Sequence, residues 1–148
     1  KHIDVRNGPA KAYKMIRVVI DTNVLVSALI KHGKPRHLVL QLLLGKNTVI
    51  LSREMLAELA DVLKRDEFII KGSQIDRFLS DLVRKSRIVT IRSHLKVISE
   101  DPDDDTVLNT AYSGKANYIV TGDKHLLALR KFKVIELVKV THMLEILR

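Results

Sequence analysis

The chain has 148 residues, of which 46% are hydrophobic, so it can form one domain with a sizeable core and is not expected to be disordered as a whole. It contains no cysteine, which excludes disulfides, thiolate metal sites and cysteine nucleophiles. Its formal net charge of +9 favours a polyanionic partner, although a generic basic surface would give the same total.

Two features of the sequence bear on where the protein works. No apolar run approaches the roughly 18 residues that a membrane-spanning helix needs. The first residues also lack the charged-then-apolar layout of a secretory signal. We therefore expect a cytoplasmic protein that does not associate with a membrane.

Short apolar strands alternate with helical patterns along the chain. Residues 1–14 show neither period, and Met15 could be the native start, so we expect an N-terminal extension at 1–14 and one domain at 15–148. Strands are expected at about 17–20, 47–51, 87–91, 118–121 and within 132–137. Helical patterns follow the first strand up to about Lys31, and then occupy 35–44, 53–65, a stretch after Ser73, a stretch from Pro102, the residues around 126–129, and 141–148. This alternation predicts an α/β fold whose parallel, five-stranded sheet has helices on both faces.

Acidic residues stand where the predicted strands end. Asp21 comes directly after the first strand, and Asp123 follows the fourth. The carboxyl ends of parallel strands meet at one edge of the sheet, where ligands bind in open α/β folds. The helices that carry Glu58 and Asp101–Asp105 also begin at that edge. We therefore expect four separate stretches to bring carboxylates to one rim.

The acids at the start of the helix near residue 102 differ in what they can do. Asp101 is placed to cap the helix, and Asp103 complements the helix dipole. Asp104 shares a helical face with apolar residues three, four and seven positions later, so its carboxylate is directed towards the core and needs a partner. Asp105 is turned about 100° further round and is the weaker candidate.

Carboxylates gathered at one rim repel one another. Two unit charges about 5 Å apart cost roughly 3 kcal/mol at an effective dielectric near 20, so either the pKa values rise or a cation lies among them. A set of oxygen ligands favours a hard ion, Mg²⁺ or Mn²⁺. Each acid also has an ordinary explanation, with Asp21 as a helix cap, Glu58 as a surface residue and Asp123 as a turn residue. Their convergence is the stronger indication.

Other chemistry is less well marked in the sequence. Asn23, Ser27 and Thr121 stand near the same strand ends and could orient an acid or a water on the metal, or simply belong to local turns. The six histidines show no ligand spacing, and His125 beside Lys124 is expected to be solvated or to face phosphate. The chain has no Gly-rich phosphate loop, no dinucleotide fingerprint and no serine nucleophile motif.

Four stretches of the chain, in this order and spacing, resemble a known family. They are VVIDTNVLVSAL, LSREMLAELADVLKR, DPDDDTVLNTA and YIVTGDKHLL. Together they resemble the PIN domain and, more narrowly, the VapC-type toxins of bacterial and archaeal toxin–antitoxin pairs, over about 15–148. The resemblance implies a Rossmann-like sheet with strand order 3-2-1-4-5.

The resemblance also assigns roles to particular residues. The catalytic and metal-binding acids that it implies are Asp21, Glu58, Asp104 and Asp123. Asn23 matches the polar residue after the first acid, and Thr121 the threonine before the fourth. Asp105 stands where relatives often have asparagine, and either Asp104 or Asp105 could be the third ligand. The implied reaction is hydrolysis of RNA phosphodiester bonds by a metal-bound water, which leaves a 5′-phosphate.

The implied partners are RNA, a second copy of the chain in a homodimer, and a small antitoxin that blocks the site. Basic residues that could hold the RNA backbone, or form a plain solvated surface, are Lys31, Lys34, Arg36, Arg53 and Lys124. Aromatic residues make up only 4% of the chain, which argues against base-stacking platforms.

Two other classes of function compete with a ribonuclease. The first is a catalytically silent module with a PIN-like fold that binds nucleic acid or a protein partner. The intact set of acids argues against it, because clustered negative charge disfavours RNA binding. The second is an aspartate-based phosphoryl-transfer protein. A haloacid-type phosphatase needs an aspartate two residues after the first, where this chain has Asn23, and a receiver domain needs an acid pair before the first helix.

Overall fold

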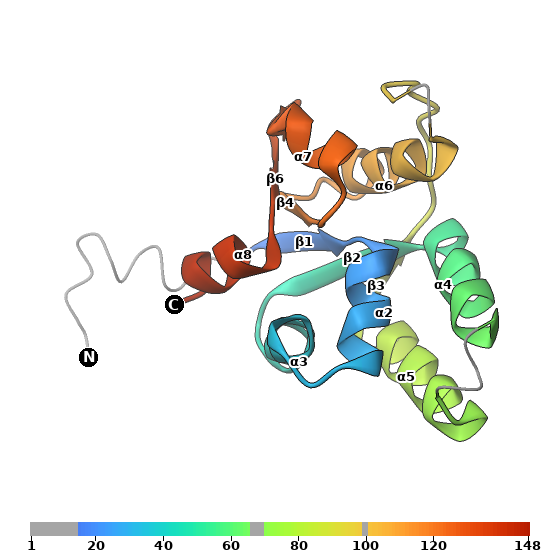
Figure 1. Ribbon diagram of the computed structural model, residues 1–148. Helices are drawn as coiled ribbons and strands as arrows, with labels where there is room; N and C mark the ends of the chain where they lie inside the picture. Colours follow the sequence, from blue (N-terminus) through green and yellow to red (C-terminus); the bar gives the residue numbers. More distant parts are fainter. Residues whose placement is uncertain (1–14, 66–69, 99–100) are drawn as a thin grey trace.

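The computed structural model describes residues 15–65, 70–98 and 101–148, so the expected extension at 1–14 lies outside the described residues. The strands are β1 (Arg17–Ile20), β2 (Thr48–Ser52), β3 (Arg87–Val89), β4 (Tyr118–Val120), β5 (Lys131–Phe132) and β6 (Ile135–Val138). The helices are α2 (Thr22–Ile30), α3 (Lys34–Leu44), α4 (Arg53–Arg65), α5 (Gly72–Lys85), α6 (Pro102–Ser113), α7 (Lys124–Leu129) and α8 (Val140–Ile146). Figure 1 shows their arrangement.

The strands form one sheet in the order β3-β2-β1-β4-β6-β5. All neighbouring pairs are parallel except β5 and β6, which are antiparallel. The α/β class is therefore confirmed, and the five parallel strands have the expected order 3-2-1-4-5. In Figure 1, α6 and α7 lie above the sheet, whereas α2 and α3 lie below it. In the part of the chain that the structure describes, no helix has the length and apolar character needed to cross a membrane.

The expected count of five strands is wrong by one, because the segment 132–137 contains a hairpin. Its first strand, β5, has only two residues and pairs with β6 at the edge of the sheet. The turn between them uses Lys133, whose φ is 58°. A lysine rarely takes this left-handed conformation, in which glycine or asparagine would have indicated a turn.

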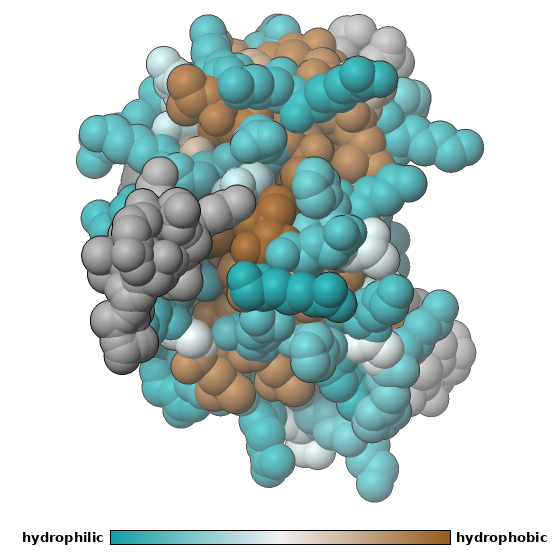
Figure 2. Space-filling model, turned by 90° about the vertical axis from the view of Figure 1, so that its left-hand side faces the viewer, coloured by the Kyte–Doolittle hydropathy of each residue, from teal (hydrophilic) through white to brown (hydrophobic). Residues whose placement is uncertain are grey.

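The centre of the sheet explains its apolar strands. Val18, Val19 and Ile20 of β1 are fully buried, because this strand is covered by helices on both faces. At the surface, hydrophobic side chains lie in patches between hydrophilic ones on the face that Figure 2 shows. The large hydrophobic residues with high exposure include Leu40 and Leu44 of α3.

An extended segment, 92–98, runs beside α6 and is held by side chains rather than by a strand partner. Its backbone amides donate hydrogen bonds of 2.8 to 3.0 Å to Asp105, Asn109 and Ser113. These acceptors are four residues apart and therefore share one face of the helix. Asn109 Nδ2 also donates to the Leu95 carbonyl at 2.9 Å. One face of α6 thus holds this segment in place.

Gly114 ends α6 in close contact with β2, so we expect Gly114→Ala to lower the free energy of unfolding by about 1–3 kcal/mol. A Cβ at this position would lie 2.7 Å from Ile50 Cγ2 and 3.2 Å from the Thr110 carbonyl oxygen. Ile50 is fully buried and has little room to move. Urea denaturation measures the change.

The matched control is Gly72→Ala at the first residue of α5, where a Cβ would meet nothing within 4 Å. Alanine is the better helix former, so this variant is expected to be neutral or slightly more stable than the original chain. Equal loss of stability in both variants would contradict the packing argument.

Candidate metal centre

The elements that carry the four candidate acids place them towards the carboxyl edge of the parallel strands. Asp21 directly follows β1, Asp123 lies three residues after the end of β4, Asp104 lies in the first turn of α6, and Glu58 lies in α4. Asp21 and Asp104 are only 6% and 5% exposed. Two nearly buried carboxylates at one edge need an electrostatic explanation, because burial disfavours the charged form.

Asp21 is held by the strand next to it. Its backbone amide donates to the Val120 carbonyl at 2.9 Å, and its side-chain Oδ2 accepts a hydrogen bond of 2.8 Å from Thr121 Oγ1. Its side chain makes no capping hydrogen bond to α2, so helix capping does not account for this acid. Burial raises the pKa of Asp21 and the charge of Asp123 adds to this, while the Thr121 hydroxyl opposes it.

Asp104 is the acid whose environment is least satisfied. Its Oδ2 is buried and has no hydrogen-bond partner among the described residues. Burial, followed by the charges of Asp123, Asp101 and Asp21, raises the pKa of Asp104 to about 7. Asp101 has the capping role expected of it, since its Oδ1 accepts the Asp103 amide at 3.0 Å. Within 15–65, 70–98 and 101–148, the structure therefore gives Asp104 Oδ2 no structural partner.

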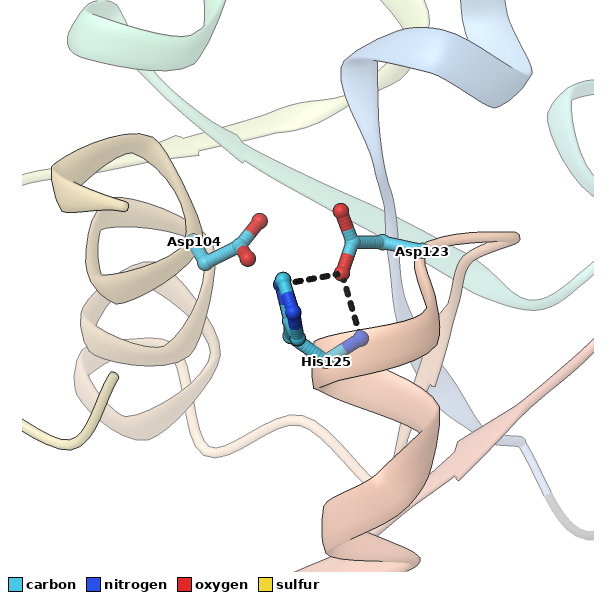
Figure 3. A group of neighbouring side chains, drawn as sticks. All are labelled: Asp104, Asp123 and His125. Carbon is cyan, nitrogen blue, oxygen red and sulfur yellow. Dashed lines mark hydrogen bonds and ion pairs between the residues drawn. The ribbon is translucent and has the colours of Figure 1, made fainter. Parts of the chain in front are cut away.

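Asp123 has two roles in the structure. Its Oδ1 accepts the backbone amides of His125 and Leu126, at 2.8 and 3.2 Å, and so caps α7. The same oxygen lies 4.0 Å from His125 Nδ1. Figure 3 shows the Asp104 carboxylate facing both side chains, and one potential ligand atom from each of the three lies within 4.8 Å of the others. Asp123 thus caps α7, a role that the sequence analysis did not assign to it, and also belongs to a group that could hold a cation.

His125 was not expected in this group. The sequence around it shows no metal-ligand spacing, because its neighbours in space come from α6 and from the turn after β4 rather than from its own segment. Its side chain is 66% exposed, so it lies at the entrance to the acidic group.

Glu58 lies apart from that tight group and faces Asp103. The two residues line an open hollow of about 680 Å³ together with Asp61, Lys64 and Arg65. Burial raises the pKa of Glu58, and the charges of Asp103 and Asp21 add to this effect. From the sequence, Asp103 was expected only to complement the helix dipole. Its position opposite Glu58 follows from the packing of α4 near α6, which no pattern in the neighbouring sequence indicates.

Asp105 points to a different part of the molecule from Asp104. Its Oδ1 accepts the backbone amides of Val97 and Ile98 at 2.9 and 2.8 Å. Between the two adjacent acids, only Asp104 belongs to the group with Asp123 and His125. The geometry therefore favours Asp104 as the third acid and gives Asp105 a part in holding the segment 92–98.

The polar and basic candidates differ in exposure and in whether their donors are already used. Asn23 is exposed and Ser27 is half-buried near Thr121. Arg36 uses its guanidinium on the end of α2, donating from Nε to the Ala28 carbonyl at 2.8 Å and from Nη2 to the Leu29 carbonyl at 2.6 Å. It therefore has few donors left for phosphate. The basic candidates with exposed side chains are Lys31, Lys34, Arg53 and Lys124.

The donor set fits a hard divalent cation. Its members are oxygen ligands with one accessible imidazole. Burial, with a smaller contribution from neighbouring acids, raises the pKa values of Asp21, Glu58 and Asp104. The observation that most directly supports a cation here is Asp104 Oδ2, which has no hydrogen-bond partner among the described residues. A buried carboxylate oxygen without a donor destabilises the fold. A cation among these groups would remove that cost.

Comparison with known proteins points to one family. A family model described as PIN domain matches residues 17–125. The chain is 34% identical over 127 residues to an uncharacterized protein of Methanocaldococcus jannaschii (MJ1680), which covers 78% of this chain and 76% of that protein.

Solved structures share the fold at low sequence identity. The structure of VapBC2 from Rickettsia felis bound to a DNA fragment from their promoter matches with a TM-score of 0.59 and 19% identity, over 84% of this chain and 98% of that one. The structure of PAE2754 from Pyrobaculum aerophilum matches with a TM-score of 0.62 and 16% identity, over 98% of both chains.

The metal-free protein is expected to become more stable as the pH falls from about 8 to 5. Asp104 has a pKa of about 7 when folded against 3.8 for an ordinary aspartate, so folding favours its protonated form. Its charge therefore destabilises the fold above pH 7, by at most about 4 kcal/mol, and this effect fades towards pH 4. Melting temperatures in chelator across this range measure the trend. Asp104→Asn should flatten it, and an unchanged slope in that variant would contradict the assignment.

Metal binding should distinguish the two adjacent acids. At pH 7.5, Mn²⁺ is expected to raise the melting temperature of the original chain and of Asp105→Asn, whose amide oxygen can still accept the two backbone amides of the segment 92–98. Asp104→Asn should be more stable than the original chain without metal and should gain little from Mn²⁺. The reverse pattern would assign the third ligand to Asp105.

Proposed function

The chain belongs to the PIN domain family, and on that premise we propose that it is a metal-dependent endoribonuclease that acts as the toxin of a type II toxin–antitoxin pair. The observation that carries this proposal is the convergence of acids from β1, α4, α6 and the turn after β4 on one edge, with an unpartnered oxygen on Asp104. A protein that only binds RNA would gain nothing from negative charge at this place.

Asp21, Asp104 and Asp123 would hold Mg²⁺ or Mn²⁺, with Glu58 completing the set from the side of α4. When bound, such an ion supplies the Lewis acidity that lowers the pKa of a water molecule and offsets the charge that develops on a phosphate. Catalytic side chains work best when they are already fixed in position. Asp21 meets this condition through Thr121, and Asp123 through its hydrogen bonds to the start of α7.

The surroundings of the acids suit a polyanionic substrate. The chain carries a net charge of +9 although several of its acids gather at one edge, so basic residues outnumber acidic ones in the rest of the chain. Arg53 is exposed and directly follows the end of β2. Lys124 is also exposed and directly follows Asp123. They would hold backbone phosphates on either side of the cleavage point, and binding would weaken as salt is added.

The proposed partners are a small antitoxin and a second copy of the chain. The fold likeness to VapBC2, which was solved with promoter DNA, supports the toxin–antitoxin assignment. Leu40 and Leu44, one turn apart on α3, are 51% and 69% exposed. An apolar stripe of this kind would be covered in a homodimer.

Cleavage of labelled single-stranded RNA tests the proposal. With Mg²⁺ or Mn²⁺ the protein should cut RNA and leave 5′-phosphate ends, and chelation should stop the reaction. Asp21→Asn should lower the rate by at least about 100-fold, because it removes a charge from the site and keeps the shape of the side chain. Asp76→Asn, at an exposed position in α5, is the matched control and should keep full activity.

Two outcomes would contradict the proposal in different ways. Cleavage that survives both chelation and Asp21→Asn would rule out the metal mechanism. Salt-dependent RNA binding without cleavage, over a broad panel of RNA sequences and both metals, would instead favour the catalytically silent binding module.

A further inference from the structure

A second hollow opens at the carboxyl edge of the sheet, next to the acids. It measures about 330 Å³ and its walls come from α2, the start of α3, the turn after β4 and the junction between β6 and α8. The residues that line it are Asn23, Val24, Ser27, Pro35, Thr121, Gly122, Lys139, Val140 and Thr141. The last three belong to a junction to which the sequence analysis assigned no role.

The lining of this hollow differs from that of the acidic site. Val24, Pro35 and Val140 provide apolar walls, while hydroxyl and amide groups provide hydrogen-bonding positions between them. Among the described residues that line it, Lys139 is the only charged one and none is an acid. By contrast, the hollow on the α4 side is lined by three acids, Glu58, Asp61 and Asp103, together with the basic residues Lys64 and Arg65. The two hollows therefore differ in character, one being mostly apolar and the other lined mainly by charged residues.

Thr121 connects the second hollow to the acids. It lines the hollow, its Oγ1 donates to Asp21 Oδ2 at 2.8 Å, and the same Oγ1 accepts the Asp123 amide at 3.0 Å. A molecule that fills the hollow would therefore lie one side chain away from both acids. A phosphate attached to that molecule would reach the acidic site.

We propose that this hollow binds the nucleoside adjacent to the phosphate at which the RNA is cut. The inference rests on the proposed ribonuclease function and adds to it a subsite that would read the neighbouring base. A volume near 330 Å³ is at the lower end of the range for small-ligand pockets, which suits one nucleoside. A flat base would lie between the apolar walls, with its edge towards Asn23, Ser27 or Thr141.

The charge of the hollow supports this occupant. Lys139 is exposed at the rim and would attract the sugar–phosphate backbone as it leaves the hollow. A metal ion is a poor fit, because no carboxylate lines the hollow. The base would be held by valine and proline surfaces, which is consistent with a chain that has few aromatic residues.

Nucleotide binding measured by NMR tests the subsite without any cleavage. With chelator present, each ribonucleoside 5′- and 3′-monophosphate is added to protein labelled on its valine methyl groups. The Val24 and Val140 methyl resonances should shift with at least one nucleotide, and inorganic phosphate or ribose 5-phosphate should leave them unchanged. Thr141→Val and Lys139→Met should each weaken the binding about five-fold, as expected for the loss of one hydrogen bond or phosphate contact.

The controls are Thr90→Val and Lys85→Met, which make the same chemical changes at exposed positions outside the hollow and should bind as the original chain does. Absent methyl shifts, shifts that inorganic phosphate reproduces, or equal weakening in the controls would overturn the subsite. The result is separate from the cleavage assay. RNA cleavage without nucleotide binding in the hollow would refute only the subsite, and nucleotide binding without cleavage of any RNA would refute only the ribonuclease.

Discussion

One buried hydroxyl, that of Thr121, sets the geometry on which the acidic site depends. The parallel pairing of β1 with β4 places Ile20 opposite Val120, so the next residues, Asp21 and Thr121, leave the sheet side by side. The hydroxyl then donates to the Asp21 carboxylate and accepts the amide of Asp123. Asp21 and Asp123, which lie far apart in the sequence, are thereby linked through two hydrogen bonds to one oxygen. Because both strands are central in the sheet, this arrangement does not depend on a flexible loop.

The acidic site destabilises the fold, because it holds two nearly buried carboxylates close to other acids. Asp104 is buried with an oxygen that has no hydrogen-bond partner in the described part of the chain, and burial and neighbouring acids raise its pKa. A core of valine, isoleucine and leucine in the central strands can tolerate this cost. Local rules of folding are most often broken where function requires it. A buried acid without a partner is such a place, whereas Asp101, which caps its helix with the same functional group, is not.

The sequence predicted much of the fold because strands and helices here have clear periods. It predicted the side of α6 on which Asp104 lies, since apolar neighbours three, four and seven residues on define that face. It missed the hairpin at 131–138, because Lys133 adopts a left-handed conformation without a residue that indicates it. It also missed the approach of Asp103 to Glu58, since only packing between distant helices brings them together. The charge of Arg36 likewise gave no sign that its guanidinium would donate to the backbone carbonyls of α2.

The hydrogen bonds between α6 and the segment 92–98 limit which substitutions α6 can accept. Around its circumference, α6 presents Asp104 to the acidic site, Val107, Leu108 and Ala111 to the core, and Asp105, Asn109 and Ser113 to the extended segment. Little of its surface remains free of a specific partner. Sequence drift should therefore be slowest in this helix and faster in α5, where most side chains face solvent. A library of random substitutions would show the same contrast as a difference in mutational tolerance between two helices of similar length.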